Sequence, residues 1–151
     1  LPREVRLRSI QFYATDISSA TLNVARKNAK LHGLDKQIIF LKGDLLKPLK
    51  QKPDLIVANL PYLSAALLRG KAALRQEPRK ALYGGKHGLD IYQRLLQQLN
   101  KRHWRNVVVL LEIDPAQKLL LEGMIIKLWP KVKAVFHQDI HGLNRVTEFK
   151  I

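Results

Sequence analysis

Short apolar stretches recur along the chain at a length typical of buried strands, and longer stretches with helical spacing separate them. Four such strands are expected, followed by two closing strands near the C-terminus, at residues 9–15, 37–41, 55–58, 107–113, 132–137 and 145–150. The runs LIVA and VVVLL, in the third and fourth strands, are apolar on both faces. That pattern is typical of central strands that helices cover on both sides.

The helix after the first strand has both of its ends marked in the sequence. Ser18 is a favourable N-cap, and Gly33 is a favourable stop. Between them, Leu22, Ala25 and Ala29 follow at i, i+3 and i+7, so they form one apolar stripe. The pattern therefore predicts a helix that packs through this stripe.

Two further helices are expected, each after an aspartate that can act as its N-cap, Asp90 and Asp114. Pro115 suits the first turn of the second of these helices, and Pro130 ends it. The expected apolar faces are Ile91, Leu95 and Leu99 in one helix, and Leu120, Met124 and Leu128 in the other.

The alternation of strands and helices predicts an α/β layer fold with a mostly parallel sheet. At 151 residues, the chain is long enough for one domain with a core and too short for two of ordinary size. The longest irregular segment, residues 64–88, contains one proline and four glycines. We expect it to form a loop or lid near one edge of the sheet.

Polar residues follow three of the expected strands: Asp16, Asp44 and Asn59. In a parallel sheet all three lie at the carboxyl edge, where open α/β folds bind ligands. Asp16 could instead cap the next helix, and Asp44 could belong to a turn. An acid at this position of a nucleotide-binding fold usually accepts hydrogen bonds from ribose hydroxyls, but none of the fifteen residues before Asp16 is a glycine.

The charge is the unusual part of the composition, because 27 Lys and Arg against 12 Asp and Glu give a net charge of +15. This balance favours anionic partners such as nucleic acid or an acidic protein, although a solvated basic surface has the same composition. The absence of cysteine excludes disulfides and thiolate chemistry and suits the cytoplasm. A membrane span is not expected, since the longest apolar run is residues 107–111 and a span needs roughly 20 residues.

The third strand ends abruptly in Asn59, Leu60, Pro61 and Tyr62. Asn and Pro both favour turns, so a plain turn is one interpretation. A site that grips a planar, amide-like substrate is the other, because an exposed amide, a rigid proline and an aromatic ring suit that task.

Six segments in this order resemble the release-factor glutamine methyltransferases: ATDISSATLNVARKNAKLHGL, GDLLKPL, DLIVANLPYL, EPRKALYGGKHGLDIYQRLL, LEIDPAQ and DIHGLNRV. The sequence Asn-Leu-Pro-Tyr alone is shared with enzymes that methylate adenine amino groups, whereas the segment from Glu77 to Leu96 is specific to the glutamine-modifying group. The resemblance covers the chain from about residue 9 onward.

The resemblance implies a Rossmann-like class I methyltransferase sheet, mostly parallel, with an antiparallel C-terminal strand. It also implies that residues 1–151 form a single, incomplete catalytic domain that lacks the first strand, the Gly-rich loop and the family's helical N-terminal domain. A missing central strand would leave the edges of its neighbours unpaired. We therefore expect the chain to be marginally stable, aggregation-prone, or repaired by direct pairing of the strands around Phe12 and Ile56.

The implied cofactor is S-adenosylmethionine. By resemblance, Asp16 holds the ribose hydroxyls and Ile17 packs on the adenine, while Asp44 and Leu45 contact the adenine amino edge. Asn59 also borders the cofactor.

The substrate glutamine would bind residues Asn59, Leu60, Pro61 and Tyr62. An amide nitrogen is a poor nucleophile, so the Asn59 side-chain oxygen and a backbone carbonyl near Leu60 would accept its two N–H groups and orient it. Catalysis would then rest on placement by Asn59, Pro61 and Tyr62, without a strong base.

Two positions depart from the family pattern. Leu60 stands where the family commonly has proline, and little loss is expected because a backbone carbonyl acts alike from either residue. Asp114 stands where the family usually has glycine, so the local turn is expected to differ, and Gln117 is a less certain marker of the site.

The implied activity is methylation of the glutamine in the Gly-Gly-Gln loop of a peptide chain release factor, on or near the ribosome, in the cytoplasm. The alternatives are an adenine amino-methyltransferase acting on rRNA or DNA, which the basic charge would suit, and a non-catalytic remnant. No metal is expected: His137, Asp139 and His141 have a possible ligand spacing, but the family match favours a structural turn there.

Overall fold

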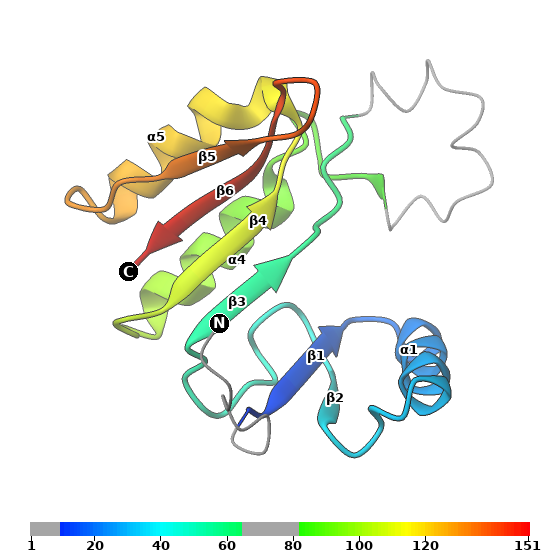
Figure 1. The fold of residues 1–151 in the computed structure, drawn as a ribbon. Coiled ribbons are helices and arrows are strands. Elements are labelled where there is room, and N and C mark those ends of the chain that lie inside the picture. The colour runs from blue at the N-terminus through cyan, green and yellow to red at the C-terminus, as the bar shows by residue number, and fades with distance from the viewer. Residues whose placement is uncertain (1–9, 65–81) are drawn as a thin grey trace, which may run out of the picture. The chain divides into compact units, whose positions relative to one another are not determined.

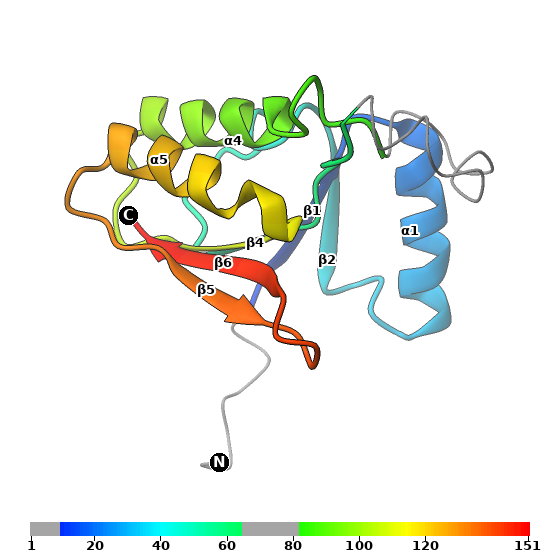
Figure 2. The same cartoon turned by 90° about the horizontal axis from the view of Figure 1, so that it is seen from above.

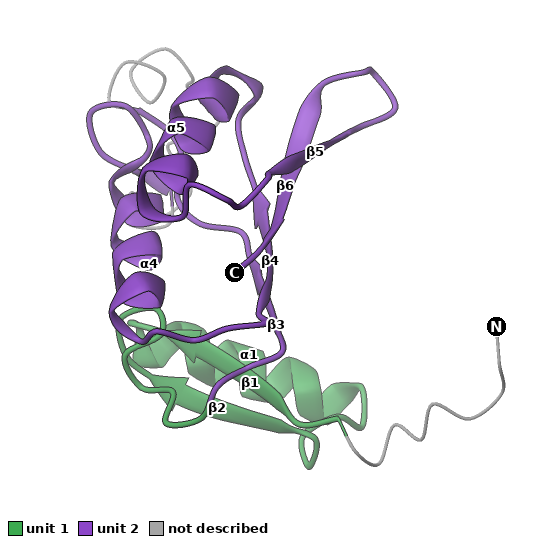
Figure 3. Cartoon of the chain, turned by 90° about the vertical axis from the view of Figure 1, so that its left-hand side faces the viewer, with its two compact units in different colours: residues 1–51 green, residues 52–151 purple. Residues whose placement is uncertain are grey.

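The computed structural model describes residues 10–64 and 82–151, and it divides the chain into two compact units, residues 1–51 and residues 52–151 (Figures 1 and 3). The part of the expected loop or lid at residues 65–81, which includes Glu77, lies outside the described residues, as do residues 1–9.

From residue 10 onward, the first unit contains one helix and a parallel pair of strands, in the order β1 (Phe12–Asp16), α1 (Ser19–Leu31) and β2 (Ile38–Lys42). The prediction for α1 is confirmed, because the Ser18 side chain accepts a hydrogen bond from the Thr21 N–H, and Gly33 follows the helix with φ of +67°. Leu22 and Ala29 are the buried residues of the helix, as the stripe predicts.

In its described residues, the second unit contains a four-stranded sheet, two helices and one 3-10 turn, in the order β3 (Leu55–Ala58), α4 (Asp90–Lys101), β4 (Val108–Glu112), η3 (Pro115–Gln117), α5 (Lys118–Leu128), β5 (Val135–Gln138) and β6 (Asn144–Lys150). The strand order is β3-β4-β6-β5. The pair β3–β4 is parallel, and β6 is antiparallel to both β4 and β5. The α/β class and the antiparallel C-terminal strand are thus confirmed. Of the described strand pairs, two are parallel and two are antiparallel.

The core of the second unit lies between its sheet and the helices α4 and α5. Figures 2 and 3 show α4 and α5 on the same side of the sheet, and the two helices are in contact. The largest fully buried side chains come from both layers: Tyr92, Leu95, Leu96 and Leu99 from α4, Leu121 and Ile125 from α5, and Val109, Leu111 and Phe149 from the sheet.

The expected cap of α4 is wrong. Asp90 is the first residue of the helix, the N-cap position is Leu89, and no side chain caps this end. The Asp90 N–H instead donates to the carbonyl of Gly84, at 2.9 Å. The buried face also differs, because Tyr92 and Leu96 join Leu95 and Leu99, while Ile91 is only half-buried.

The expected face of α5 is wrong by one position. Leu121 and Ile125 are buried, whereas Leu120 is 56% exposed. Apolar side chains occupy residues 119–121 and 124–126, so a spacing of four residues fits either face. Asp114 caps the 3-10 turn η3, which precedes α5.

The strands β1 and β3 belong to separate sheets. Among the described residues, β1 pairs with β2 and β3 pairs with β4, so the direct pairing of the strands around Phe12 and Ile56 is not observed. β3 is an edge strand, and its Leu55 and Val57 are 52% and 71% exposed. Unpaired edges of this kind favour association with other chains, so marginal stability and aggregation stay predictions.

A search of the described helices for one long and apolar enough to cross a membrane finds none.

Candidate functional site

The carboxyl ends of β1 and β2 bring the two predicted aspartates of the first unit to one edge. Asp16 is the last residue of β1, and Asp44 follows β2 by two positions. The Gly43 N–H donates to the Asp16 carbonyl at 2.9 Å, which ties the two loops together. Both aspartates therefore lie where parallel strands of an α/β fold present ligand-binding groups.

One oxygen of the Asp16 carboxylate binds the start of α1, the alternative role that its position allows, and the other oxygen stays available. Its Oδ1 accepts a hydrogen bond from the Ser18 N–H at 2.6 Å, at the start of α1. Within the described part of the chain, Oδ2 has no hydrogen-bond partner, and the next side chain, Ile17, is 66% exposed. A carboxylate oxygen beside an exposed apolar side chain fits a ribose diol next to an adenine ring, so these residues fit the adenosine part of S-adenosylmethionine.

The turn after β2 has an unusual backbone. Leu45 has φ of +54°, a left-handed conformation that costs a residue other than glycine about 1–2 kcal/mol. Asp44 beside it is largely buried, with 18% of its side chain exposed, and its Oδ2 lies 3.1 Å from the Lys47 ammonium. Outliers of this kind concentrate at functional sites, which agrees with the predicted role of the pair.

In the second unit, the loop after β3 presents an amide to solvent. Asn59 follows the last residue of β3 and is exposed, and its side chain has no hydrogen-bond partner among residues 10–64 and 82–151. Leu60, Pro61 and Tyr62 are half-buried. The Asn59 amide is therefore not used by a local turn and is available to a ligand.

Tyr62 lies beside Glu112, the last residue of β4. The phenol oxygen is 3.5 Å from Glu112 Oε1, at the limit for a hydrogen bond. Burial, and after it the negative charge of Glu112, raise the pKa of the Tyr62 phenol above its ordinary value. The backbone of Glu112 is fixed from the other side, because the Tyr92 hydroxyl donates to its carbonyl.

Two glycines let the segment before α4 lie directly against the Asn59–Tyr62 loop. A β-carbon on Gly84 would overlap the Pro61 carbonyl oxygen, and one on Gly88 would overlap the Tyr62 carbonyl oxygen. Two further bonds join the segments next to this contact, from the Leu63 N–H to the Leu82 carbonyl and from the Gly84 N–H to the Leu63 carbonyl. The glycines thus serve close backbone packing, and the spacing Gly84, Gly85, Gly88 does not form a phosphate loop after a strand.

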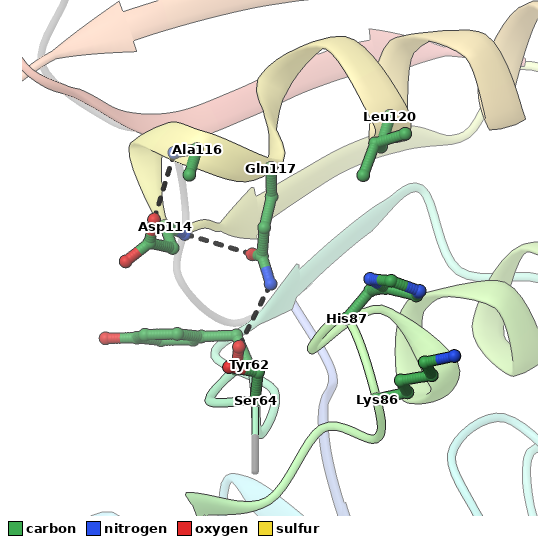
Figure 4. Close-up of a pocket in the computed structure, with 8 residues that line it drawn as sticks. All are labelled: Tyr62, Ser64, Lys86, His87, Asp114, Ala116, Gln117 and Leu120. Atoms are coloured by element: carbon green, nitrogen blue, oxygen red, sulfur yellow. Dashed lines mark hydrogen bonds between the residues drawn. The ribbon is translucent and has the colours of Figure 1, made fainter. Parts of the chain in front are cut away.

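Gln117 connects these segments through its side-chain amide. It is 5% exposed, and Figure 4 shows it pointing toward Tyr62. Its Nε2 donates to the carbonyls of Tyr62 and Gly88, and its Oε1 accepts from the Asp114 N–H. Sequence reasoning undervalued this residue, and it did not single out Glu112.

A cavity of about 350 Å³ opens beside this network in the second unit (Figure 4). Its lining mixes apolar, cationic and polar side chains: Tyr62, Ser64, Lys86, His87, Asp114, Ala116, Gln117 and Leu120. The cavity borders Tyr62, the final residue of the Asn59–Tyr62 loop, whereas Asn59 is not one of its lining residues.

The predicted structural turn at Asp139 is confirmed. Its Oδ1 accepts hydrogen bonds from the backbone N–H groups of His141 and Leu143, and its Oδ2 accepts one from Arg145 Nε at 3.0 Å. His137 pairs with Glu148 instead, at 2.8 Å. In the described part of the chain, no three potential metal-ligating side chains gather in one place.

The predicted site residues thus fall into two groups, each in its own unit. The structure brings Asp16, Ile17, Asp44 and Leu45 to one edge of the first unit, and it places Asn59–Tyr62 in one loop of the second. The binding roles of these residues stay predictions.

Comparison with known proteins points to methyl transfer. Residues 2–102 match a protein-family model described as "RMKL-like, methyltransferase domain". The release factor glutamine methyltransferase of Bacillus anthracis is 32% identical over 144 residues, which are 92% of this chain and 50% of that protein. The ribosomal protein uL3 glutamine methyltransferase of Bradyrhizobium diazoefficiens is 38% identical over 115 residues, 73% of this chain and 35% of that protein.

Solved structures agree on the fold. A methyltransferase from Pyrococcus furiosus is 19% identical with a TM-score of 0.62, over 93% of this chain and 62% of that one. The curated relatives confirm the resemblance to release-factor glutamine methyltransferases, and the solved structure confirms the fold. The chain spans about half the length of the first of the relatives that it matches.

Proposed function

The chain belongs to the family described as RMKL-like methyltransferase domains, and from this premise we propose that it contributes to S-adenosylmethionine-dependent methylation of a glutamine side-chain amide in the Gly-Gly-Gln loop of a peptide chain release factor. The observation that supports this proposal most directly is the exposed Asn59 amide, which has no partner among the described residues and directly follows the edge strand β3. The name of the Bacillus anthracis relative supports the choice of substrate.

The substrate half of the reaction needs orientation rather than a base. The Asn59 Oδ1 and the Leu60 carbonyl accept the two N–H groups of the target amide, which fixes its nitrogen and makes it richer in electrons. Pro61 stiffens the loop because its φ is fixed. Orientation of this kind supplies several kcal/mol of the barrier reduction.

Tyr62 offers a ring face to the substrate. Its raised pKa keeps the phenol protonated at neutral pH, so it does not supply a base. The amide nitrogen needs none, since its surplus proton leaves to water once the new bond has formed.

The cofactor half of the site is assigned to the first unit. Asp16 would accept hydrogen bonds from the ribose hydroxyls, Ile17 would pack against the adenine, and Asp44 with Leu45 would contact the adenine edge. Bound S-adenosylmethionine would supply an electrophilic methyl group.

A second candidate substrate is a glutamine of a ribosomal protein. The name of the Bradyrhizobium diazoefficiens relative favours it. The chemistry required of Asn59 and Leu60 is the same for both substrates, because each presents a primary amide.

Label transfer separates these candidates. The chain is incubated with a methyl-labelled donor and, in separate reactions, with a release factor, ribosomal protein uL3 or ribosomal RNA, and mass spectrometry then locates the label. We expect label on the glutamine of the Gly-Gly-Gln loop. Label on uL3 alone would select the second candidate, and label on adenine would overturn glutamine methylation.

Calorimetry with the cofactor tests the remaining alternative. A chain that binds S-adenosylmethionine retains the cofactor half of the site, whereas the absence of binding together with the absence of label would identify a non-catalytic remnant.

A further inference from the structure

We propose that Gln117 is a positioning residue that fixes the Asn59–Tyr62 loop in the conformation that receives the substrate amide. The inference rests on the proposed function for the role of the loop, and on the hydrogen bonds of Gln117 for the role of the residue. Gln117 acts through the loop backbone and is not itself placed against the reacting atoms.

The side-chain amide of Gln117 is fully used. Nε2 donates to the Tyr62 carbonyl at 3.0 Å and to the Gly88 carbonyl at 2.9 Å, and Oε1 accepts from the Asp114 N–H at 3.1 Å. A primary amide has two N–H donors in one plane with its oxygen, so this geometry satisfies both donors and the acceptor. Because Gln117 is 5% exposed, water cannot easily replace a lost bond.

The three bonds join segments that are far apart in the sequence. Tyr62 belongs to the loop after β3, Gly88 precedes α4, and Asp114 follows β4. β3 ends at Ala58, so its ladder does not hold the residues that follow. Outside the glutamine, the loop is tied to the Gly84 segment by the bonds of Leu63. Gln117 therefore ties the backbone of the loop to the segment that follows β4, next to the contact of Tyr62 with Glu112 at the end of that strand.

The bond to Tyr62 also bears on which acceptors meet the substrate. The loop contains several backbone carbonyls, and a target amide has two N–H groups to place. The Tyr62 carbonyl faces Gln117 and is already bonded, and the Pro61 carbonyl packs against Gly84, so the proposal assigns the substrate to the Asn59 Oδ1 and the Leu60 carbonyl. Gln117 thus fixes the position of the loop and occupies one of its carbonyl acceptors.

A purely structural role makes a different prediction. If Gln117 only completed the capping box of η3, its replacement would loosen the start of α5 and lower global stability. In the folded fraction, the order of the Asn59–Tyr62 loop and the rate of methyl transfer would then be normal. If Gln117 positions the loop, local order around Tyr62 and Gly88 changes without loss of the sheet.

The test uses Gln117→Glu and Gln117→Leu, with Gln97→Glu on the exposed side of α4 as the matched control. Gln117→Glu keeps the size of the side chain and the acceptor for Asp114 but removes both donors. Amide hydrogen exchange at neutral pH reports the order of the loop in the whole chain without any substrate. We expect the amides of Leu63, Gly84 and Gly88 to exchange at least about tenfold faster in both variants, with Val109 and Phe149 unchanged.

Where Gln117→Leu fails to fold, the pH dependence of Gln117→Glu still decides. Protonation of the introduced carboxyl restores one donor, so the exchange rates relative to wild type at the same pH are expected to approach one as the pH falls. Unchanged exchange at Leu63, Gly84 and Gly88 in Gln117→Glu would overturn the inference.

Turnover is measured in parallel with the substrate that the wild-type chain methylates. We expect kcat to fall about a hundredfold in Gln117→Glu, with cofactor affinity unchanged. Faster loop exchange with normal kcat would overturn the positioning role. If the wild-type chain methylates none of the substrates, the proposed function fails, and exchange alone decides whether Gln117 fixes the loop.

Discussion

The α-carbon of Gly88 faces the carbonyl oxygen of Tyr62, in a space too small for a β-carbon. A β-carbon built on Gly88 would overlap that oxygen and would lie 2.6 Å from Gln117 Nε2. Gly88 also has φ of +71°, which side-chain-bearing residues rarely adopt. Both backbone conformation and close contact therefore require glycine at this position.

Gly88→Ala is expected to lower the free energy of unfolding by about 2–5 kcal/mol, the sum of a left-handed backbone and a forced contact. Gly142→Ala is the matched control, since Gly142 has φ of +74° with no atom within 4 Å of the added β-carbon. It should cost only about 1–2 kcal/mol in the same urea titration. Equal losses in the two variants would show that the contact with Tyr62 contributes nothing.

Asn59→Ala is expected to reduce methyl transfer at least about a hundredfold, because the target amide loses the acceptor that orients it. The urea midpoint should be nearly unchanged, since the Asn59 side chain is exposed. Asn28→Ala, on the exposed side of α1, serves as the control. Steady-state rates with the labelled donor provide the measurement, and a wild-type rate in Asn59→Ala would exclude the amide as an acceptor.

Asp16→Asn is expected to weaken cofactor binding about 10- to 100-fold. The substitution keeps an oxygen for the Ser18 N–H but removes the negative charge that strengthens hydrogen bonds from ribose hydroxyls. Calorimetry measures the change. Asp35→Asn makes the same charge change at an exposed position and should bind like wild type. If both variants lose affinity equally, the effect is one of net charge and not of Asp16.

The turn at Asp139 makes stability depend on acidity. The hydrogen bonds from Leu143 N–H and from the Arg145 side chain hold the pKa of the Asp139 carboxyl below its ordinary value. The stabilisation is therefore complete above the unfolded pKa, about 3.9, and is lost as the pH falls through the lower folded pKa. Asp139→Asn should lower the thermal midpoint at neutral pH.

The difference between Asp139→Asn and wild type should vanish in strong acid, where both residues are neutral. Asp54→Asn is the comparison, because the Asp54 side chain is 99% exposed and its pair with Lys52 is expected to contribute little. A midpoint difference for Asp139→Asn that stays constant with pH would exclude the ionised carboxylate as its cause.

Features that depend on neighbouring residues were predictable from the sequence. Ser18 and Gly33 mark the ends of α1 because each acts within one turn of itself. β3 was predicted at residues 55–58, its observed bounds, since a short apolar run between polar residues admits few alternatives.

Features that depend on distant residues were not predictable in this way. The N–H of Asp90 is satisfied by Gly84, whose own position depends on the Pro61 backbone, so an aspartate before a helical pattern was mistaken for a cap. Gln117 shows both cases at once. Its bond to Asp114 follows from a spacing of three residues, which is a capping-box signal, whereas its bonds to Tyr62 and Gly88 exist only in the folded chain.

The order of the strands has a consequence for how the second unit folds. The turn between β5 and β6 pairs Gln138 with Asn144, so a short loop closes this hairpin quickly. Leu55 of β3, in contrast, pairs with Val108 of β4, and the whole of α4 lies between these two residues in the sequence. We expect the C-terminal hairpin to form early and β3 to join late, an order that pulse-labelled exchange would reveal as late protection of Ile56 relative to Thr147. The loop that presents Asn59 would then take shape only after most of its scaffold exists.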